Sequence, residues 1–243
     1  MAITDLEQAL GTTPRPVALG VVVVTGGASG LGAAVVDAVQ REGGTPVVVD
    51  RAEPGREVAH EIVDLADGRD AEATVRRVAE RHGGLDAVVA AAGTDSCGKL
   101  ADVAADEWER VIRVNLLGTA AVVRAALPYL EASGGRVVTV ASTLGLRGLS
   151  DATAYCASKF GVVGFTRALA AETAGRVGVT LLLPGGMHTA FFDGRPDEYK
   201  PAPDARLNRP EDVAEAVLFA LRQPPGCEVR ELLVAPSTET SWP

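Results

Sequence analysis

One tyrosine and one lysine in the middle of the sequence stand at a spacing that suits proton transfer. Tyr155 and Lys159 lie four positions apart in YCASK, so a helix would place both side chains on one face. A phenol with its ordinary pKa of about 10 is a poor base at neutral pH, but a neighbouring ammonium group favours its ionised form. The pair predicts a general acid/base centre, although the same spacing also occurs on solvated helix faces.

A glycine-rich segment near the N-terminus has the composition of a phosphate-binding turn. TGGASGLG, residues 25–32, follows an apolar run and precedes an alanine-rich stretch. Glycines here allow a tight turn and close packing, and the N-terminus of the following helix offers free N–H groups to a pyrophosphate. A purely structural turn is the alternative, but the strand–turn–helix context favours a dinucleotide. The expected contacts are Gly26, Ala28, Ser29, Gly30, Leu31 and Gly32.

The residues that end the next apolar run bear on which dinucleotide binds. Asp50 closes this run, and a carboxylate there accepts hydrogen bonds from both hydroxyls of an adenosine ribose. It would also repel the 2′-phosphate of NADP. Arg51 follows directly and is able to bind that phosphate, so both cofactors stay open. Because Asp50 is the better placed of the two, we expect NAD rather than NADP.

The elements that must position these residues follow from the alternation of short apolar runs with longer amphipathic stretches. The expected strands are Val21–Thr25, Pro46–Asp50, Ala87–Ala91, Arg136–Ala141, Val179–Leu183 and Glu231–Val234, with a weaker candidate over Glu61–Asp64. The expected helices are Leu31–Glu42, Ala71–His82, Ala105–Leu130, Ala152–Thr173 and Glu211–Leu221. Continuous apolar strands suit a parallel sheet buried on both faces. We expect one α/β domain over residues 1–243, a Rossmann-type, doubly wound, mainly parallel sheet of about seven strands with helices on both faces, preceded by an N-terminal arm over residues 1–17.

The composition limits the partners and the compartment. The 243 residues carry a formal net charge of -9 and have an isoelectric point of about 4.9, so nucleic acid and anionic membranes would repel the surface. Uninterrupted apolar runs are too short to cross a bilayer, and the N-terminus shows no secretion signal. The three cysteines lack metal-ligand or disulfide-framework spacing, so we expect no metal and a cytoplasmic setting.

Five motifs, in order along the chain, resemble those of the short-chain dehydrogenase/reductase family. They are the TGGASGLG turn, Asn115 in VNLLGT, Ser142 after an expected strand, the Y-x-x-x-K pair, and a P-G-x-x-x-T segment formed by Pro184, Gly185 and Thr189. The resemblance extends from about residue 20 to residue 221. Taken together the motifs are specific, although each polar residue alone has an ordinary structural explanation such as capping.

The resemblance implies a reaction and a role for each residue. Tyr155 would exchange a proton with a secondary alcohol or ketone as a hydride passes to or from NAD, and Ser142 would hydrogen-bond the substrate oxygen. Lys159 would also hold the nicotinamide ribose, and Asn115 would position a water for proton relay. Further cofactor contacts are implied for Asp64, Leu65, Ala91, Ala92, Gly93, Pro184, Gly185, Met187 and Thr189.

The sequence departs from the family pattern in three places. Ala90-Ala91-Ala92-Gly93 stands where the family has N-N-A-G, so both asparagine side chains are replaced. The segment between Asp50 and Asp64 leaves little room for the usual helix, and the chain ends VAPSTETSWP rather than with D-G-G. No role of the family's C-terminus is therefore carried over to this chain.

Residues 190–209, AFFDGRPDEYKPAPDARLNR, interrupt the regular pattern and are rich in proline and charge. A substrate lid with apolar anchors and a surface excursion both fit this segment. Closeness in sequence to the catalytic strand ends suggests further substrate contacts, although a loop histidine such as His188 is also explained by simple exposure. These candidates are Thr94, Thr143, Leu144, Leu149, His188, Phe191 and Phe192.

Three functions stay open at this point. The first is an active NAD-dependent oxidoreductase for a small alcohol or carbonyl substrate, and the second is an NADP-linked biosynthetic ketoreductase. The third is a catalytically idle dinucleotide-binding sensor or scaffold, which the alanines at 90 and 91 would suit. The family commonly forms dimers or tetramers through the helices that contain Asn115 and Tyr155, so a homodimer or homotetramer is expected.

Overall fold

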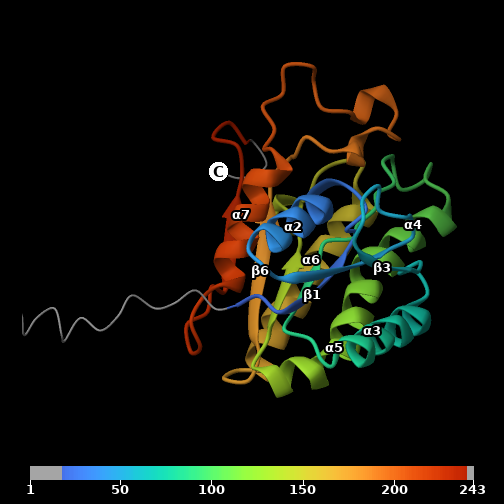
Figure 1. The fold of residues 1–243 in the computed structure, drawn as a ribbon. Helices are drawn as coiled ribbons and strands as arrows, with labels where there is room; N and C mark the ends of the chain where they lie inside the picture. The colour runs from blue at the N-terminus through green and yellow to red at the C-terminus, as the bar shows by residue number, and fades with distance from the viewer. Residues whose placement is uncertain (1–17, 240–243) are drawn as a thin grey trace, which may run out of the picture.

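A computed structural model describes residues 18–239, in which seven parallel strands form one twisted sheet (Figure 1). Their order across the sheet is β3–β2–β1–β4–β5–β6–β7. The strands are β1 (Val21–Thr25), β2 (Thr45–Asp50), β3 (Ala59–Ile62), β4 (Ala87–Ala90), β5 (Arg136–Val140), β6 (Gly178–Pro184) and β7 (Glu231–Val234). The expected doubly wound fold is confirmed, while the expected N-terminal arm lies outside the described residues.

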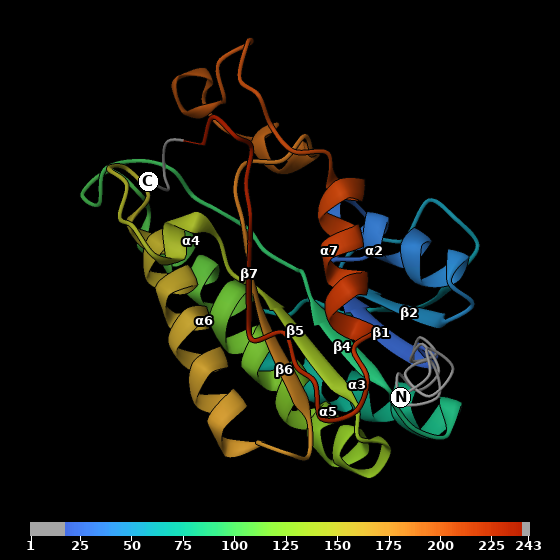
Figure 2. The same cartoon turned by 90° about the vertical axis from the view of Figure 1, so that its left-hand side faces the viewer.

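Helices cover both faces of the sheet (Figure 2). On one face α2 (Gly30–Arg41) lies beside α7 (Pro210–Leu221), and on the other lie α3 (Gly68–His82), α5 (Thr119–Ser133) and α6 (Thr153–Glu172). Valines of the central strands point alternately into the two layers: Val22 and Val24 join the core under α2 and α7, and Val23 joins the core under α3 and α5. Two-sided burial explains why these strands contain continuous apolar runs rather than alternating apolar and polar residues.

The chain order of the strands reverses between β1 and β4, which are neighbours in the sheet. From β1 the sheet continues through β2 to β3, and from β4 it continues in the opposite direction through β5 to β7. Connections leave the carboxyl ends of β1 and β4 toward opposite faces, so a crevice opens at this edge of the sheet. The loops after β1, β4, β5 and β6 therefore meet there.

The long helix expected over Ala105–Leu130 is not regular. It consists of α4 (Ala105–Ile112), a six-residue π-helical segment η1 (Arg113–Gly118), and α5, which ends at Ser133 before the left-handed Gly134. In a π turn the backbone bonds shift by one residue, and here the Thr119 hydroxyl donates to the Asn115 carbonyl at 2.9 Å. The irregularity coincides with Asn115, which periodicity alone could not reveal.

The continuous helical stretch Ala105–Ser133 is long and apolar enough to cross a membrane by length and composition, with a mean hydropathy of 1.4 over an 18-residue window. The sequence predicted no membrane-spanning segment, because its uninterrupted apolar runs are short. More than half of that window, 56%, is buried inside the protein, and α5 packs against α3 and β4. These contacts are those of a core helix.

Two other boundaries differ from expectation for local reasons. α3 begins at Gly68 rather than Ala71 because the Asp67 carboxylate accepts hydrogen bonds from Arg69 N at 3.0 Å and Asp70 N at 3.1 Å. Such N-caps satisfy N–H groups that the helix itself cannot. The weak strand near Glu61–Asp64 forms two residues earlier, as β3, and no helix precedes it in the short connection from β2.

Candidate functional site

The glycine turn between β1 and α2 adopts a conformation that only glycine tolerates at three positions. Gly26 and Gly30 have positive φ angles of 71° and 54°. A Cβ on Gly26 would lie 2.8 Å from Ala92 Cα, and one on Gly32 would lie 2.2 Å from the Gly26 carbonyl oxygen. The turn therefore packs backbone against backbone, and the Ala92 N–H donates to the Thr25 hydroxyl at 3.2 Å. Close backbone packing and the Thr25 hydroxyl thus hold the alanine-rich loop to the turn without the family's asparagines.

The start of α2 provides an anion-binding geometry. Ser29 is the N-cap, but its side chain accepts no hydrogen bond from the helix, so the first N–H groups keep their capacity for an outside acceptor. These groups and the positive end of the helix dipole line the cleft described below. The combination of absent Cβ atoms and free N–H donors fits a pyrophosphate.

The carboxylate of Asp50 lies directly beside this turn. Its Oδ2 accepts from Ala28 N at 3.0 Å and its Oδ1 accepts from Ala52 N at 3.1 Å, which leaves each oxygen able to accept another hydrogen bond. Arg51 is exposed and lines the same cleft. Both a ribose acceptor and a possible phosphate partner are therefore present at the end of β2.

Asp64 forms part of the same rim. A hydrogen bond from Ala66 N at 3.0 Å lowers the pKa of its carboxyl group, and Arg110 of α4, whose Nη2 lies 2.9 Å from Asp64 Oδ2, adds to this effect. Asp64 is therefore ionised at neutral pH and connects the β3 edge to α4 across the mouth of the cleft.

The reactive residues gather at the carboxyl ends of β4 and β5. Tyr155 and Lys159 lie on α6, and the Lys159 Nζ is 5.5 Å from the Tyr155 ring centroid. Ser142 is the N-cap of the short turn after β5, where its hydroxyl accepts from Leu144 N at 3.1 Å, and it acts on the phenol of Tyr155 by lowering its pKa. The buried Lys159 ammonium donates to the Val140 carbonyl at 2.8 Å, which holds it under the phenol.

Burial shifts both titrating groups in opposite directions. It raises the pKa of Tyr155 above its ordinary value, and the Ser142 hydrogen bond partly counteracts this. It lowers the pKa of Lys159 to about 8, against a smaller opposing effect of the Asp95 charge. The phenol is therefore protonated at neutral pH in this state, ready to donate a proton, and the nearby ammonium is close to titration.

Asn115 stands one layer behind the reactive residues and is only 1% exposed. Its Oδ1 accepts from Thr94 N at 2.8 Å, and its Nδ2 donates to Thr94 O at 2.9 Å and to Ser158 Oγ at 3.0 Å. The amide thus joins the loop after β4 to α6. It fixes Thr94 at the edge of the cleft while making no contact with the cleft itself.

The segment after β6 closes the site opposite the loop after β4. Thr189 approaches the glycine turn so closely that a Cβ on Gly30 would lie 3.4 Å from its Cγ2. Met187 pairs with Asn208 in an isolated parallel bridge, and the His188 N–H donates to the Asn208 carbonyl at 2.9 Å. The 190–209 segment therefore leaves and rejoins the fold at one place.

These parts surround one large cleft of about 1310 Å³. Most residues predicted from the sequence line it, and these are Gly26, Ser29, Gly30, Leu31, Gly32, Asp50, Arg51, Asp64, Leu65, Ala91, Ala92, Gly93, Thr94, Ser142, Thr143, Leu144, Leu149, Tyr155, Lys159, Pro184, Gly185, Met187, Thr189, Phe191 and Phe192. Three do not. The Ala28 N–H is bound by Asp50, Asn115 lies behind the wall, and His188 is exposed with only its backbone tied into the fold.

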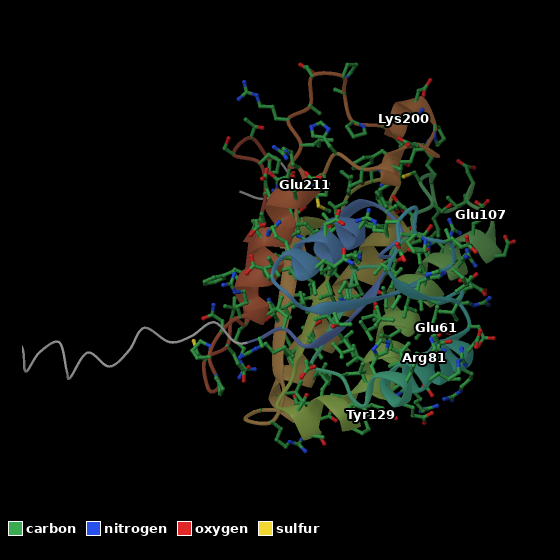
Figure 3. All side chains as sticks on the ribbon, in the orientation of Figure 1. Glu61, Arg81, Glu107, Tyr129, Lys200 and Glu211 are labelled. Atoms are coloured by element: carbon green, nitrogen blue, oxygen red, sulfur yellow. The ribbon has the colours of Figure 1, made fainter. Side chains whose placement is uncertain are left out.

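Several cleft residues were not among the site residues predicted from the sequence, although Tyr199 was expected as an apolar anchor of the 190–209 segment. Asp95, Arg195 and Tyr199 line the substrate side, and Glu107 and Lys200 mark two separate parts of the rim (Figure 3). The only available sign for Asp95 was its position two residues after the A-A-A-G run. Nothing in the sequence linked Asp95 to Arg195, because 100 residues separate them.

Comparison with known proteins agrees with this geometry. The family model for short chain dehydrogenases matches residues 20–200, which is most of the chain. The chain belongs to the short-chain dehydrogenase family. It is an oxidoreductase by family and has the nucleotide-binding fold of that family, which implies a small-molecule substrate.

Three relatives illustrate the likeness. An uncharacterized oxidoreductase of Staphylococcus aureus (strain MW2) is 35% identical over 228 residues, covering 89% of this chain and 96% of the relative. An alcohol dehydrogenase from Thermococcus sibiricus, solved with 5-hydroxy-NADP, is 28% identical with a TM-score of 0.80 and covers 88% of this chain and 95% of its own. A putative NAD(P) dependent gluconate 5-dehydrogenase from Beutenbergia cavernae, solved with NADP at low occupancy, is 32% identical with a TM-score of 0.81. The match covers 92% of this chain and 97% of the dehydrogenase.

Proposed function

We propose that this short-chain dehydrogenase interconverts a secondary alcohol and a ketone with a nicotinamide nucleotide, with Tyr155 as the general acid/base. The observation that carries the proposal is the convergence of Tyr155, Ser142 and Lys159 on the cleft that also contains the glycine turn. Fold likeness alone would not specify a reaction, but these three groups at one point form a site for proton transfer beside a nucleotide.

Each side chain of the site has a separate role in this proposal. When bound, the nicotinamide supplies or accepts the hydride at the substrate carbon. Ser142 hydrogen-bonds the substrate oxygen, and Tyr155 donates a proton to that oxygen in reduction or removes it in oxidation. The Lys159 charge, 5.5 Å from the phenol ring, favours the phenolate and so assists the oxidative direction.

Asn115 acts in this proposal as a positioning residue with a role in proton relay. Both hydrogens of its amide are occupied by Thr94 and Ser158. A relay water therefore has to donate to the remaining lone pairs of the amide or backbone oxygen rather than accept from the amide. Relay along this path would connect Lys159 to solvent.

We propose NAD as the preferred cofactor on the strength of Asp50, whose oxygens keep free lone pairs beside the glycine turn. NADP use is the alternative, supported by Arg51 at the same rim and by the two NADP-bearing relatives. The test is the dissociation constant of NADH and NADPH for the native protein and for Asp50→Ala. We expect the native protein to bind NADH at least tenfold more tightly than NADPH, and Asp50→Ala to remove this preference. A repulsion of about 1.4 kcal/mol between Asp50 and the 2′-phosphate would raise the dissociation constant of NADPH tenfold. Equal or tighter NADPH binding by the native protein would establish the alternative.

The reaction itself is tested by NADH oxidation over a panel of ketones with native protein and Tyr155→Phe. We expect the variant to lose about 100-fold or more in kcat while binding NADH as before, because general acid catalysis contributes on that order. Tyr129→Phe is the matched control, since Tyr129 lies on α5 at the opposite end of the sheet (Figure 3). Full activity of Tyr155→Phe would refute the assignment, and NADH binding without turnover of any ketone would favour the idle sensor or scaffold.

We also propose that the face formed by η1 and α6 pairs with a second copy of the chain. Leu117 and Phe160 on this face are 55% and 46% exposed, which is costly for large apolar side chains in a monomer. Phe160→Glu should lower the mass measured by light scattering from a dimer or tetramer toward a monomer. An unchanged mass would exclude this face.

A further inference from the structure

A buried ion pair crosses the substrate side of the cleft. Arg195 Nη2, in the 190–209 segment, lies 2.6 Å from Asp95 Oδ2 in the loop after β4. The side chain of Asp95 is 5% exposed and that of Arg195 is 18% exposed. Buried charges are rare unless paired, so this contact constrains both loops.

Both partners are fixed by further contacts. Asp95 Oδ1 accepts from Ser96 N at 2.8 Å, and its Oδ2 also accepts from the Cys97 thiol at 3.2 Å. Arg195 Nη1 donates to the Tyr199 carbonyl at 3.3 Å. The carboxylate is thus held by its own loop, and the guanidinium by its own segment, so the ion pair is the link between them.

Arg195 also organises the aromatic residues that face Tyr155. Its guanidinium carbon lies 5.0 Å from the Phe191 ring centroid and 4.6 Å from that of Phe192, within cation–π range. The Phe191 ring in turn lies 5.7 Å from the Tyr155 ring. The ion pair therefore holds an apolar wall against the phenol that would meet the substrate.

We infer that Asp95 and Arg195 are specificity-determining residues: as a neutral pair they hold the 190–209 segment closed over Tyr155 and select uncharged, largely apolar ketones or alcohols over carboxylates. This inference rests on the proposed dehydrogenase function and names its substrate class. It also assigns the segment the role of a lid.

The charges at the site favour uncharged substrates over carboxylates. A carboxylate substrate would enter beside Asp95, whose charge acts on both Tyr155 and Lys159, while the charge of Arg195 opposes it at Tyr155. To gain Arg195 it would have to displace Asp95, which would leave a buried carboxylate without its partner, a strongly unfavourable state. An uncharged substrate keeps the pair intact and gains contact with Phe191, Phe192 and Leu149, which all line the cleft.

The pair is also suited to opening. Arg195 Nε is buried and has no hydrogen-bond partner among residues 18–239, so one donor of the guanidinium is unsatisfied when the segment is closed. An unmet buried donor costs free energy and offsets part of the ion pair. The closed state is therefore only moderately favoured, as a segment that admits substrate and releases product requires.

The test uses two ketones that differ only in charge, methyl 4-acetylbenzoate and 4-acetylbenzoate, with full-length native protein, Asp95→Asn, Arg195→Met and the double variant. Asp95→Asn is isosteric and keeps the acceptor for Ser96 N. We expect the native protein to favour the ester in kcat/KM, and Asp95→Asn, which leaves the Arg195 charge uncompensated, to reduce the ester-to-acid ratio at least tenfold.

The other variants separate charge from general disruption. Arg195→Met leaves the Asp95 charge uncompensated and should raise the ratio, while the double variant should return it to within about threefold of native, because the net charge is again zero. Asp204→Asn changes an exposed charge of the same segment that does not line the cleft and is the control, expected to leave the ratio unchanged. A ratio that stays constant, or that moves in the same direction in both single variants, would overturn the inference.

Deuterium exchange provides a readout independent of turnover. Peptides from the 190–209 segment should exchange faster in Asp95→Asn, Arg195→Met and the double variant than in native protein or Asp204→Asn. Unchanged exchange would overturn the lid role even if neither ketone is converted. If the native protein converts ketones through Tyr155 but the ion-pair variants change neither the ratio nor the exchange, only this inference is refuted. If the protein binds NADH without turnover of any ketone, the proposed function is refuted.

Discussion

The buried amide of Asn115 gives the sharpest prediction about how the site is held together. Asn115→Leu keeps a side chain of similar size but removes the hydrogen bonds with Thr94 N, Thr94 O and Ser158 Oγ. Each such bond is worth about 1 kcal/mol net, and the half-buried Thr94 backbone groups lose their partner in the folded state. We therefore expect the free energy of unfolding to fall by about 3 kcal/mol, or the melting temperature to fall by roughly 6–12 °C for a chain of this length.

The measurement is urea unfolding followed by circular dichroism, with Asn208→Leu as the matched control. Asn208 donates one side-chain hydrogen bond, to the Val234 carbonyl at 3.2 Å, so its replacement should cost only about 1 kcal/mol. A loss for Asn115→Leu no greater than that for Asn208→Leu would refute the reasoning, because it would mean that the three bonds do not stabilise the π-helical segment and the loop after β4.

Three further predictions concern other parts of the fold. The pKa of Lys159 in the folded protein, about 8, lies below the ordinary value of lysine, so the unfolded chain binds more protons above pH 8 and stability should rise with pH. Between about pH 7 and about pH 9.5 the native protein should gain about 2 kcal/mol relative to Lys159→Met in urea titrations, and a parallel pH dependence of the two proteins would disprove the shift. Gly32→Ala places a Cβ 2.2 Å from the Gly26 carbonyl oxygen and should weaken NADH binding, measured by fluorescence, at least 100-fold, whereas Gly164→Ala, with open space around it, should leave binding intact. Asp67→Ala removes the cap of α3 and should lower the unfolding free energy by about 1 kcal/mol, and an unchanged transition midpoint in urea would contradict the capping role.

Much of the fold could be read from local pattern because the pattern has a direct physical cause. Val21–Thr25 begins with four valines in succession, rather than alternating apolar and polar residues, since a central parallel strand is buried on both faces, and glycines end helices where a left-handed residue is needed. The order of strands and helices then limits the topology to a doubly wound sheet. The ends of elements were harder to predict than their order. The start of α3, for example, depends on the hydrogen bonds of a single side chain, Asp67.

The candidate site divides in the same way. Residues with a fixed spacing along one element, such as Tyr155 and Lys159 on α6, were predictable because helix geometry alone brings them together. The glycine turn was predictable because its backbone conformation excludes a Cβ. By contrast His188 lies exposed outside the cleft, although its neighbours Met187 and Thr189 both line it.

The sequence by itself determined the sheet, the family and the residues expected to move a proton, because these depend on local periodicity and short motifs. Only the tertiary structure brought Asp95 to Arg195 across 100 residues and broke the helix around Asn115 into a π turn. Neither feature has a local signature. Each arises because loops at the carboxyl ends of different strands are forced to the same edge of the sheet, where their polar groups must find partners once they are removed from water.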